Sequence, residues 1–350
     1  MKEEQTFTEN IEKLFSNENN FSICEKYKSN TIIDNSQSNY DYTIAIPTYK
    51  RQTSLIEAIE SAIRQTNTTN IKYEILVVDN DSEPNTEVKK LIQNKYANQR
   101  DFRYIKNSEN LQVFGNWNRC FELSKSKWVI LLHDDDILHS TFIETINKVL
   151  IHISAPDSLA IIKPTLISWY EKNERPNYKE HNTKKFKFKK VKAFDYLFLG
   201  NYFGAPTCCL FNKDIILKTG GFSKIIEPCG DIATILKLSM TYDVFLLKYV
   251  LGIQRIGTNE TLNPKTLELF IRTRYYVSKY LIQHYHLKKV LNKHYMSAFM
   301  YSFYKNIQQW WNKDFHFDIN NINECKVSYL DIAYYKIIKN IYRIYFKICR

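Results

Sequence analysis

Residues 42–80 read YTIAIPTYKRQTSLIEAIESAIRQTNTTNIKYEILVVDN and contain a strand–helix–strand pattern. The run at 42–47 is β-branched and ends in proline, which is typical of a strand. Apolar residues recur at helical spacing over 54–66. A continuous apolar run at 73–80 ends in Asp-Asn. Because parallel strands need a right-handed crossover between them, this stretch predicts a parallel α/β sheet.

The alternation of strands and helices continues along the chain and indicates an α/β fold with a mainly parallel sheet flanked by helices. Further elements are predicted as strands at 102–107, 127–136, 159–170, 205–212 and 243–256, and as helices at 115–125 and 230–240. From about Leu267 the chain is expected to be helical.

Three parts follow from this pattern. Residues 1–41 are rich in Asn, Ser and Glu and are predicted to form a loosely helical extension. The α/β domain is assigned to 42–262, with halves at 42–140 and 141–262. Residues 263–350 are predicted to form a helical, basic C-terminal region.

Composition limits the class of protein. Of the 350 residues 44% are hydrophobic and 15% aromatic, which is enough for a sizeable core. The seven cysteines show no CxxC spacing, which favours reduced thiols over a disulfide framework or a structural zinc site. The N-terminus has no signal-peptide pattern, and no apolar run is long enough to span a membrane. We therefore expect a cytoplasmic protein.

Charge is concentrated near the C-terminus. The formal net charge is +12, and residues 265–350 hold 15 Lys and Arg against 5 Asp and Glu. A second basic cluster, KKFKFKKVK, occupies 184–192. This distribution predicts anionic partners such as a phosphorylated ligand or an acidic membrane surface.

Polar clusters follow three of the predicted strands: Pro47–Arg51, Asp79–Asp81 and Asp134–Asp136. In an open parallel sheet, ligands bind at the carboxyl ends of the strands. Convergence of three polar strand ends therefore predicts a binding site at this edge.

Three consecutive aspartates, Asp134 to Asp136, lie in the stretch LLHDDDILH. Capping of the next helix is the simplest alternative, but a cap needs only one acidic residue. Mg²⁺ and Mn²⁺ prefer carboxylate oxygens, and Mg²⁺ is commonly held by one or two carboxylates plus substrate phosphates. A metal–diphosphate site is the favoured interpretation.

Four motifs in order, YTIAIPTYKR, EILVVDND, NSENLQVFGNWNRC and WVILLHDDDIL, make residues 42–140 resemble the nucleotide-sugar half of a family 2 glycosyltransferase. Weaker signals extend the resemblance to about residue 260. It implies a GT-A, Rossmann-like fold and the hexosyltransferase class of activity, of the type that builds bacterial surface polysaccharide.

The resemblance also implies roles for individual residues. The aspartate run would occupy the DXD position, with Asp136 and Asp134 binding Mn²⁺ or Mg²⁺. The metal would neutralise charge on the departing nucleoside diphosphate. The residues implied in binding the nucleotide sugar are Pro47, Thr48, Tyr49, Arg51, Asp79, Asn110, Gly115, Asn118, Asp134 and Asp135.

A general base must deprotonate the acceptor hydroxyl. In the family it is an acid at a helix start, shortly after a Gly-Gly-Phe turn. Gly220-Gly221-Phe222 followed by Asp231 matches this pattern and implies inversion at the anomeric carbon. Capping alone is the other interpretation of Asp231, and Glu227 is the substitute candidate.

This sequence departs from the family pattern at several positions. Gln112 stands where a glycine is frequent, Gly230 replaces one acid of a Glu-Asp pair, and His133 replaces an Asp. The Gln-x-x-Arg-Trp motif of processive synthases is absent, since no Trp follows Arg255. We therefore expect one sugar to be added per event.

The tail 334–350, YYKIIKNIYRIYFKICR, forms an amphipathic pattern if helical. One stripe holds Tyr334, Ile337, Ile338, Ile341, Tyr345 and Ile348, and another holds Lys336, Lys339, Arg343, Lys347 and Arg350. Such a helix can lie in an anionic membrane interface, or it can dock on the core. The charge favours peripheral contact with the inner face of the membrane, which would suit a glycan or polyprenyl-diphosphate-linked acceptor.

Two other functions were weighed. A sugar-nucleotide nucleotidyltransferase should carry a glycine-rich phosphate loop near the first strand, and IPTYKRQTS has none. A non-enzymatic nucleic-acid or membrane-binding protein would use the basic C-terminus, but no nucleic-acid motif accompanies it. We expect a nucleotide-diphosphate sugar as the donor, with UDP favoured, and no nucleic acid.

Overall fold

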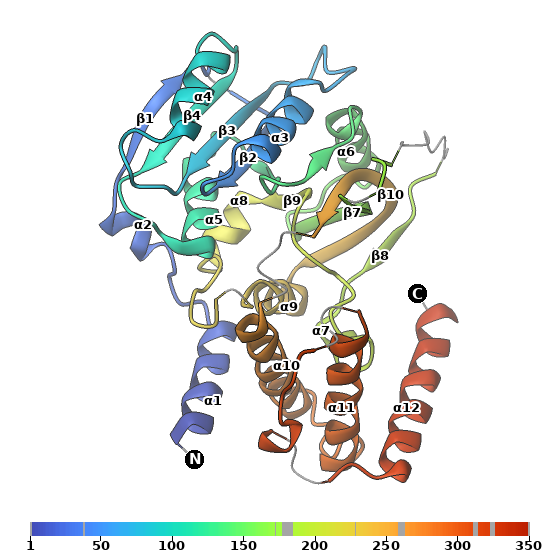
Figure 1. Ribbon diagram of the computed structural model, residues 1–350. Coiled ribbons are helices and arrows are strands. Elements are labelled where there is room, and N and C mark those ends of the chain that lie inside the picture. The colour runs from blue at the N-terminus through green and yellow to red at the C-terminus, as the bar shows by residue number, and fades with distance from the viewer. Residues whose placement is uncertain are drawn as a thin grey trace.

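The structure is a computed structural model that describes residues 2–37, 39–171, 173–176, 185–227, 229–257, 263–310, 314–322 and 326–348. A sheet in the order β1-β4-β3-β2-β5-β9-β7-β10-β6 forms the upper part of the molecule in Figure 1, and β8 pairs with β10. Most C-terminal helices lie below it.

The strands are β1 Ser29–Asp34, β2 Tyr42–Thr48, β3 Tyr73–Asp79, β4 Phe102–Asn107, β5 Trp128–Leu131, β6 Ile137–Leu138, β7 Leu159–Tyr170, β8 Phe188–Lys190, β9 Cys209–Asn212 and β10 Asp243–Ile256. The helices of the α/β part are α2 Ser22–Lys26, α3 Thr53–Ile63, α4 Glu87–Tyr96, α5 Gln112–Leu123, α6 Phe142–His152, α7 Ala193–Leu199, α8 Lys213–Lys218 and α9 Asp231–Thr241. Flanking them are α1 Lys2–Phe15, α10 Pro264–His284, α11 Lys293–Trp310 and α12 Tyr329–Ile348.

The predicted parallel core is confirmed. Strands β4, β3, β2 and β5 run parallel to one another, and β7 runs parallel to β10. Antiparallel strands complete the sheet: β9 joins the two parallel groups, and β1, β6 and β8 pair at its margins. The carboxyl ends of β2, β3 and β5 therefore share one edge, as the sequence predicted.

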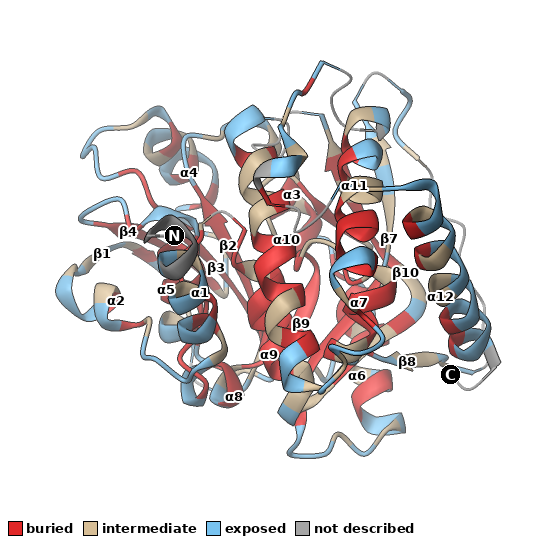
Figure 2. Cartoon of the chain, turned by 90° about the horizontal axis from the view of Figure 1, so that it is seen from below, coloured by how far each residue is buried: buried red, intermediate tan, exposed pale blue. Residues whose placement is uncertain are grey.

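Side chains of the central strands alternate between two hydrophobic cores, because successive residues of a strand point to opposite faces. On β2, Ile44 and Ile46 belong to one core together with α3, α4 and α6, whereas Ala45 belongs to the other. The second core includes α5, α9 and the C-terminal helices. Figure 2 shows buried residues on the strands and on the helices that lie over them. The sheet is thus covered on both faces.

The N-terminal extension is an integral part of the fold. Strand β1 pairs antiparallel with β4 and adds an edge to the sheet. Helix α1 packs against α9 and α10, where Phe15 stacks on Tyr280 with ring centroids 4.2 Å apart. A strand here was not predicted, because the segment is rich in Asn and Ser and only Ile32 and Ile33 mark it.

Strand β5 is shorter than predicted, and this difference creates the site. The pattern predicted a strand over 127–136, but β5 ends at Leu131. His133 to Asp136 form a turn in which the Asp136 N–H donates to the His133 carbonyl at 3.1 Å. The chain then enters β6 at Ile137. Adjacent carboxylates repel one another, so they leave the ladder for a turn.

Five cysteines in the described part of the chain are free and buried, as expected for reduced thiols. Cys325 and Cys349 lie outside the described residues. None of the helices in the ranges given above combines the length and hydropathy that a bilayer-spanning segment needs.

Candidate active site

The ends of β2 and β5 are joined by hydrogen bonds between their polar residues. The Thr48 hydroxyl donates to Asp134 Oδ2 at 2.7 Å, and the Tyr49 N–H approaches the same oxygen at 3.4 Å. Arg51 lies 3.9 Å from Asp135. Pro47 and Thr48 are buried, whereas the Tyr49 side chain is exposed. Four of the residues assigned to the nucleotide thus form one continuous surface with the aspartates.

Asp79, at the end of β3, lies in the interior. It accepts hydrogen bonds from the Tyr104 hydroxyl at 2.6 Å and from the Asp81 N–H at 3.0 Å, and it pairs with Lys106 at 3.3 Å. The burial of Tyr104 and the adjacent Asp79 carboxylate raise the pKa of the Tyr104 hydroxyl well above its usual range. These contacts stabilise the end of β3, and the role of Asp79 in binding the nucleotide sugar stays a prediction.

Asn80 organises the loop that precedes α5. Its Nδ2 donates to Asn110 Oδ1 at 2.8 Å, and its Oδ1 accepts the Leu111 N–H at 2.8 Å. Asn110 is exposed beside this loop, and its Oδ1 also accepts the Gln112 N–H. Gln112 has φ 64°, the left-handed conformation that glycine favours. The backbone therefore follows a glycine-type path without a glycine.

Two residues assigned to the sugar side lie inside α5. A Cβ on Gly115 would come within 2.9 Å of Leu111 Cβ, so glycine permits close packing here. Asn118 is buried and bonds both backbone groups of Phe222: Nδ2 donates to its carbonyl and Oδ1 accepts its N–H, each at 2.8 Å. Asn118 thus ties α5 to the Gly220-Gly221-Phe222 turn, and contact of either residue with sugar stays a prediction.

Asp136 is the most deeply buried member of the aspartate run. Its Oδ1 accepts the backbone N–H of Arg255 at 2.8 Å. The Arg255 guanidinium binds Glu171 at 2.8 Å and Glu57 at 3.0 Å, and its Nε donates to the Asp135 carbonyl at 3.0 Å. The Trp169 ring lies 4.7 Å from it. Arg255 therefore holds the aspartate turn, while two glutamates neutralise its charge.

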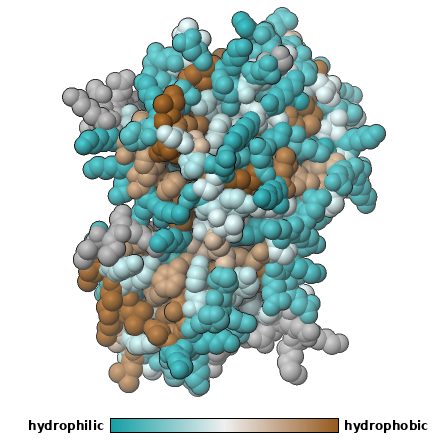
Figure 3. Space-filling view, turned by 180° about the vertical axis from the view of Figure 1, so that it is seen from behind, coloured by the Kyte–Doolittle hydropathy of each residue, from teal (hydrophilic) through white to brown (hydrophobic). Residues whose placement is uncertain are grey.

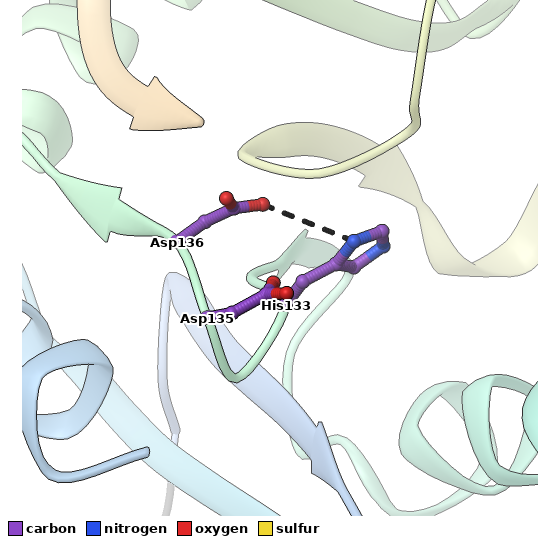
Figure 4. A group of neighbouring side chains, drawn as sticks. All are labelled: His133, Asp135 and Asp136. Atoms are coloured by element: carbon purple, nitrogen blue, oxygen red, sulfur yellow. Dashed lines mark ion pairs between the residues drawn. The ribbon is translucent and has the colours of Figure 1, made fainter. Parts of the chain in front are cut away.

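A set of possible metal ligands converges on this turn. Ligand atoms of His133, Asp135 and Asp136 all lie within 4.8 Å of one another (Figure 4). His133 Nδ1 is 3.9 Å from Asp136 Oδ2, and His133 Nε2 is buried without a hydrogen-bond partner in the described chain. Two carboxylates and the imidazole nitrogen that faces Asp136 suit a divalent cation. Asp134, expected to pair with Asp136 at the metal, faces Thr48.

Burial opposes ionisation of these carboxylates. It raises the pKa of Asp136 to about 8, with a further contribution from Asp135. It also raises the pKa of Asp134 to about 6, against the opposing hydrogen bond from Thr48. Buried anions held this close together are stabilised by a bound cation. The charge of the turn thus points to the same conclusion as its geometry.

Asp231 begins α9, as predicted from the sequence. Burial raises the pKa of its carboxyl to about 6, while the helix N–H groups and the Lys163 ammonium act in the opposite direction. Glu227 instead accepts the Phe114 N–H at 2.9 Å, which engages it at the start of α5. Burial thus brings the pKa of Asp231 into the range suited to a general base.

Sequence reasoning missed Lys163, a buried lysine on β7. Its ammonium donates to the Ala205 carbonyl and lies 4.9 Å from the Phe203 ring centroid. Burial lowers its pKa, while Asp231 and Asp136 both oppose that shift. Lys163 thus lies in the field of the candidate base and of the aspartate turn. A lysine inside the apolar run LAIIKPTLI was the available signal.

Comparison with solved structures supports the fold. S. aureus TarS 1–349 in complex with UDP has a TM-score of 0.52 at 12% identity, with 87% of this chain and 91% of that chain covered. The mannosyltransferase PcManGT from Pyrobaculum calidifontis, in complex with GDP-Man and Mn²⁺, has a TM-score of 0.51 at 11% identity, covering 91% and 87%. This chain spans 44% of the longer TarS structure.

Sequence comparison adds the family to the fold. An uncharacterized protein of Mycobacterium tuberculosis, MT1568, is 22% identical over 218 residues, which is 61% of this chain and 66% of that protein. The pattern of glycosyl transferase family 2 matches residues 43–220, just over half of the chain. With its GT-A fold and the strand-end site described above, this chain belongs to glycosyl transferase family 2.

Proposed function

We propose that the chain transfers one sugar from a nucleotide-diphosphate sugar to an acceptor hydroxyl, with inversion and with Mn²⁺ or Mg²⁺ bound at the aspartate turn. The observation behind this proposal is that Thr48 bonds Asp134 in the turn that also holds Asp136, and that the charges of Asp136 and Asp231 both act on the buried Lys163 ammonium and oppose the lowering of its pKa by burial. This arrangement supports a donor site with a candidate base near it.

The nucleotide would lie on the surface formed by the β2 and β5 ends. Tyr49 exposes its ring there, and Arg51 offers a cation beside Asp135. TarS was solved with UDP and PcManGT with GDP-Man, so related folds accept both nucleotides. We favour a UDP-sugar as the donor.

The metal would be held by Asp136 with Asp135 or Asp134. When bound, it neutralises charge on the leaving nucleoside diphosphate. Arg255 keeps the turn in place but does not compete with the metal for the Asp carboxylates, because its guanidinium is bound by Glu57 and Glu171. The turn's carboxylates therefore remain available for the ion.

Asp231 would remove the proton from the acceptor hydroxyl as the acceptor oxygen attacks the anomeric carbon. The bond between that carbon and the diphosphate oxygen breaks, and attack from the opposite face inverts the configuration. Asp231 is ionised above its pKa of about 6, so it can accept a proton at neutral pH. Removal of its carboxylate should stop transfer and leave donor binding intact.

Release of nucleoside diphosphate from UDP-, GDP- and dTDP-sugars with Mn²⁺ tests this function, with water as the surrogate acceptor. With at least one of these donors, wild-type protein should release nucleoside diphosphate faster than Asp231→Asn does. Both proteins should bind that donor with equal affinity. The matched control is Glu227→Gln, which should retain release. Equal release by wild type and Asp231→Asn, with loss in Glu227→Gln, would show that the base is misassigned.

We also propose that α12 contacts an anionic membrane, which would bring the enzyme to a glycan or polyprenyl-diphosphate-linked acceptor. The helix docks on the core through Tyr335, Tyr342 and Phe346, and Tyr334 and Ile338 of the predicted stripe also pack against that core. Outside this contact it still exposes apolar side chains, seen at the lower left of Figure 3. They include Ile337, Ile341, Ile344 and Tyr345, each at least half exposed.

The charge of α12 selects an anionic lipid surface as the partner. Lys336, Arg343 and Lys347 are exposed along the helix beside the apolar stripe. Basic and apolar stripes side by side suit the interface between lipid headgroups and acyl chains. The two alternatives considered from the sequence, core docking and membrane contact, are thus compatible on one helix.

Sedimentation with vesicles tests this contact. The triple variant Ile337→Ser, Ile341→Ser, Ile344→Ser should lose binding to phosphatidylglycerol-containing vesicles, because it removes exposed apolar side chains. The buried face of α12 is unchanged, so the variant should still fold. Ile151→Ser on α6, a residue 70% exposed, is the control and should bind like wild type. Equal partitioning of the triple variant and wild type would contradict the proposal.

A further inference from the structure

We propose that His133 is a nitrogen ligand of the metal, and that it makes the site prefer Mn²⁺ or Co²⁺ over Mg²⁺. This inference rests on the proposed metal-dependent transfer and specifies the ligand set of that site. It replaces a site made of oxygen ligands alone with one of imidazole nitrogen and carboxylate oxygen.

The first support is the unsatisfied imidazole. His133 Nε2 is buried with no hydrogen-bond partner in the described residues. Nδ1 lies 3.9 Å from Asp136 Oδ2, which is too long for a hydrogen bond. Leaving buried polar atoms unpaired costs about 1–3 kcal/mol each. A cation between His133 and Asp136 would be bound by Nδ1, while Nε2, the other ring nitrogen, would carry the proton.

The second support is the fixed direction of the ring. The His133 N–H donates to the Thr207 hydroxyl at 3.2 Å, which holds the backbone. The Trp117 ring packs over the imidazole, with centroids 4.9 Å apart and planes 30° from parallel. In Figure 4 the imidazole and the Asp136 carboxylate point toward each other. The imidazole is therefore oriented toward the carboxylate before any ion binds.

The third support is that the two carboxylate oxygens of Asp136 have different partners. Oδ1 accepts the Arg255 N–H, whereas Oδ2 faces His133. Asp135 completes the group within 4.8 Å. Each of the three side chains can thus offer one ligand atom.

The preference among metals follows from ligand chemistry. Mg²⁺ is held by oxygen and gains little from an imidazole, whereas first-row transition metals bind imidazole nitrogen well. A histidine where many family members carry aspartate should therefore weaken Mg²⁺ more than Mn²⁺ or Co²⁺. His133→Asp should reverse this preference while keeping a ligand at the position.

Pulsed electron paramagnetic resonance on the full chain with Mn²⁺ and either UDP or GDP tests the ligand directly. Wild type should show ¹⁴N modulation from a bound imidazole, and His133→Asp should lose it. The ratio of Mn²⁺ to Mg²⁺ affinity should fall about tenfold or more in His133→Asp. His152→Gln, which removes an exposed imidazole on α6, should leave both measurements unchanged.

The outcomes separate this inference from the proposed function. Wild-type protein that binds Mn²⁺ without ¹⁴N modulation overturns the His133 ligand and leaves metal-dependent transfer intact. An unchanged affinity ratio in a folded His133→Asp also overturns it. Failure of wild type to bind either metal with either nucleotide refutes the metal dependence itself. The spectrum of wild type is decisive even if the variant does not fold.

Discussion

Asp136 Oδ1 accepts the backbone N–H of Arg255 at 2.8 Å, although the two residues lie 119 positions apart in the chain. This bond joins the aspartate turn after β5 to the end of β10. The Arg255 side chain adds a bond to the Asp135 carbonyl and two ion pairs, to Glu57 and Glu171. The bond thus joins residues 42–140 and residues 141–262 at the proposed metal site.

Arg255→Met should weaken metal binding without removing any metal ligand. The variant keeps the backbone N–H to Asp136 but loses the bond to Asp135, so the turn is less restrained. We expect the affinity for Mn²⁺ to fall about tenfold, as for loss of other groups that orient metal ligands. Calorimetry measures this, and Arg272→Met, from an α10 ion pair with Glu268, is the control. Equal Mn²⁺ affinity in Arg255→Met and Arg272→Met would contradict the role of Arg255 in holding the aspartate turn.

Asp136→Asn and Asp134→Asn should differ in their effects. Asp136 faces the converging ligands, so its substitution should abolish Mn²⁺-dependent donor binding. Asp134 is bonded by Thr48 and Tyr49, so its substitution should weaken nucleotide binding and spare much of the metal affinity. Titration of each variant with Mn²⁺ in the absence and presence of UDP separates the two effects. Loss of metal binding in Asp134→Asn alone would instead restore the Asp134–metal assignment.

The pH dependence of transfer should show an acid limb near pH 6. Asp231 must be ionised to accept a proton, and its pKa is raised to about 6, mainly by burial. Below that pH the rate should fall about tenfold per unit. Lys163→Met removes an ammonium that lowers this pKa, so the limb should move to higher pH.

The metal ligands could also produce an acid limb, because protons compete with metal for carboxylates. The two causes are separated by repeating the profile at several Mn²⁺ concentrations. A limb due to Asp231 stays in place, whereas a limb due to the ligands moves to lower pH as Mn²⁺ rises. If the acid limb moves with Mn²⁺ concentration and stays at the same pH in Lys163→Met, Asp231 is not its source.

Asn118→Ala should destabilise the protein. Its side chain pairs with both backbone groups of Phe222, and these buried groups would lose their partners. The expected loss is about 1–3 kcal/mol of unfolding free energy, measured by urea denaturation. The donor KM distinguishes the two interpretations of this residue. Unchanged stability with a raised KM would favour contact with the sugar over a structural role.

The sequence predicted the parallel core well because each strand–helix unit carries its own pattern. The runs at 102–107, 159–170 and 243–256 coincide with β4, β7 and β10. Such elements are specified locally by periodicity and length. The Gly-Gly-Phe turn and the helix start at Asp231 were found from the same local signals.

The contacts that complete the site could not be predicted in this way. Arg255 and Lys163 reach it from β10 and β7, and only the sheet order brings those strands close to β5. Nothing in the sequence indicated that the Asn118 side chain would bond the Phe222 backbone rather than contact a sugar. Gln112 shows the converse, since its backbone adopts the glycine conformation that its side chain disfavours. Long-range contacts decide each of these cases.

Calorimetric titration of the full chain with UDP-, GDP- and dTDP-sugars, each with Mn²⁺ and with EDTA, tests the central claim most directly. The account predicts that at least one donor binds saturably with Mn²⁺, binds far more weakly with EDTA, and loses the Mn²⁺-dependent part in Asp136→Asn. Donor binding that is unaffected by metal removal and by Asp136→Asn would contradict it, as would failure of every donor to bind.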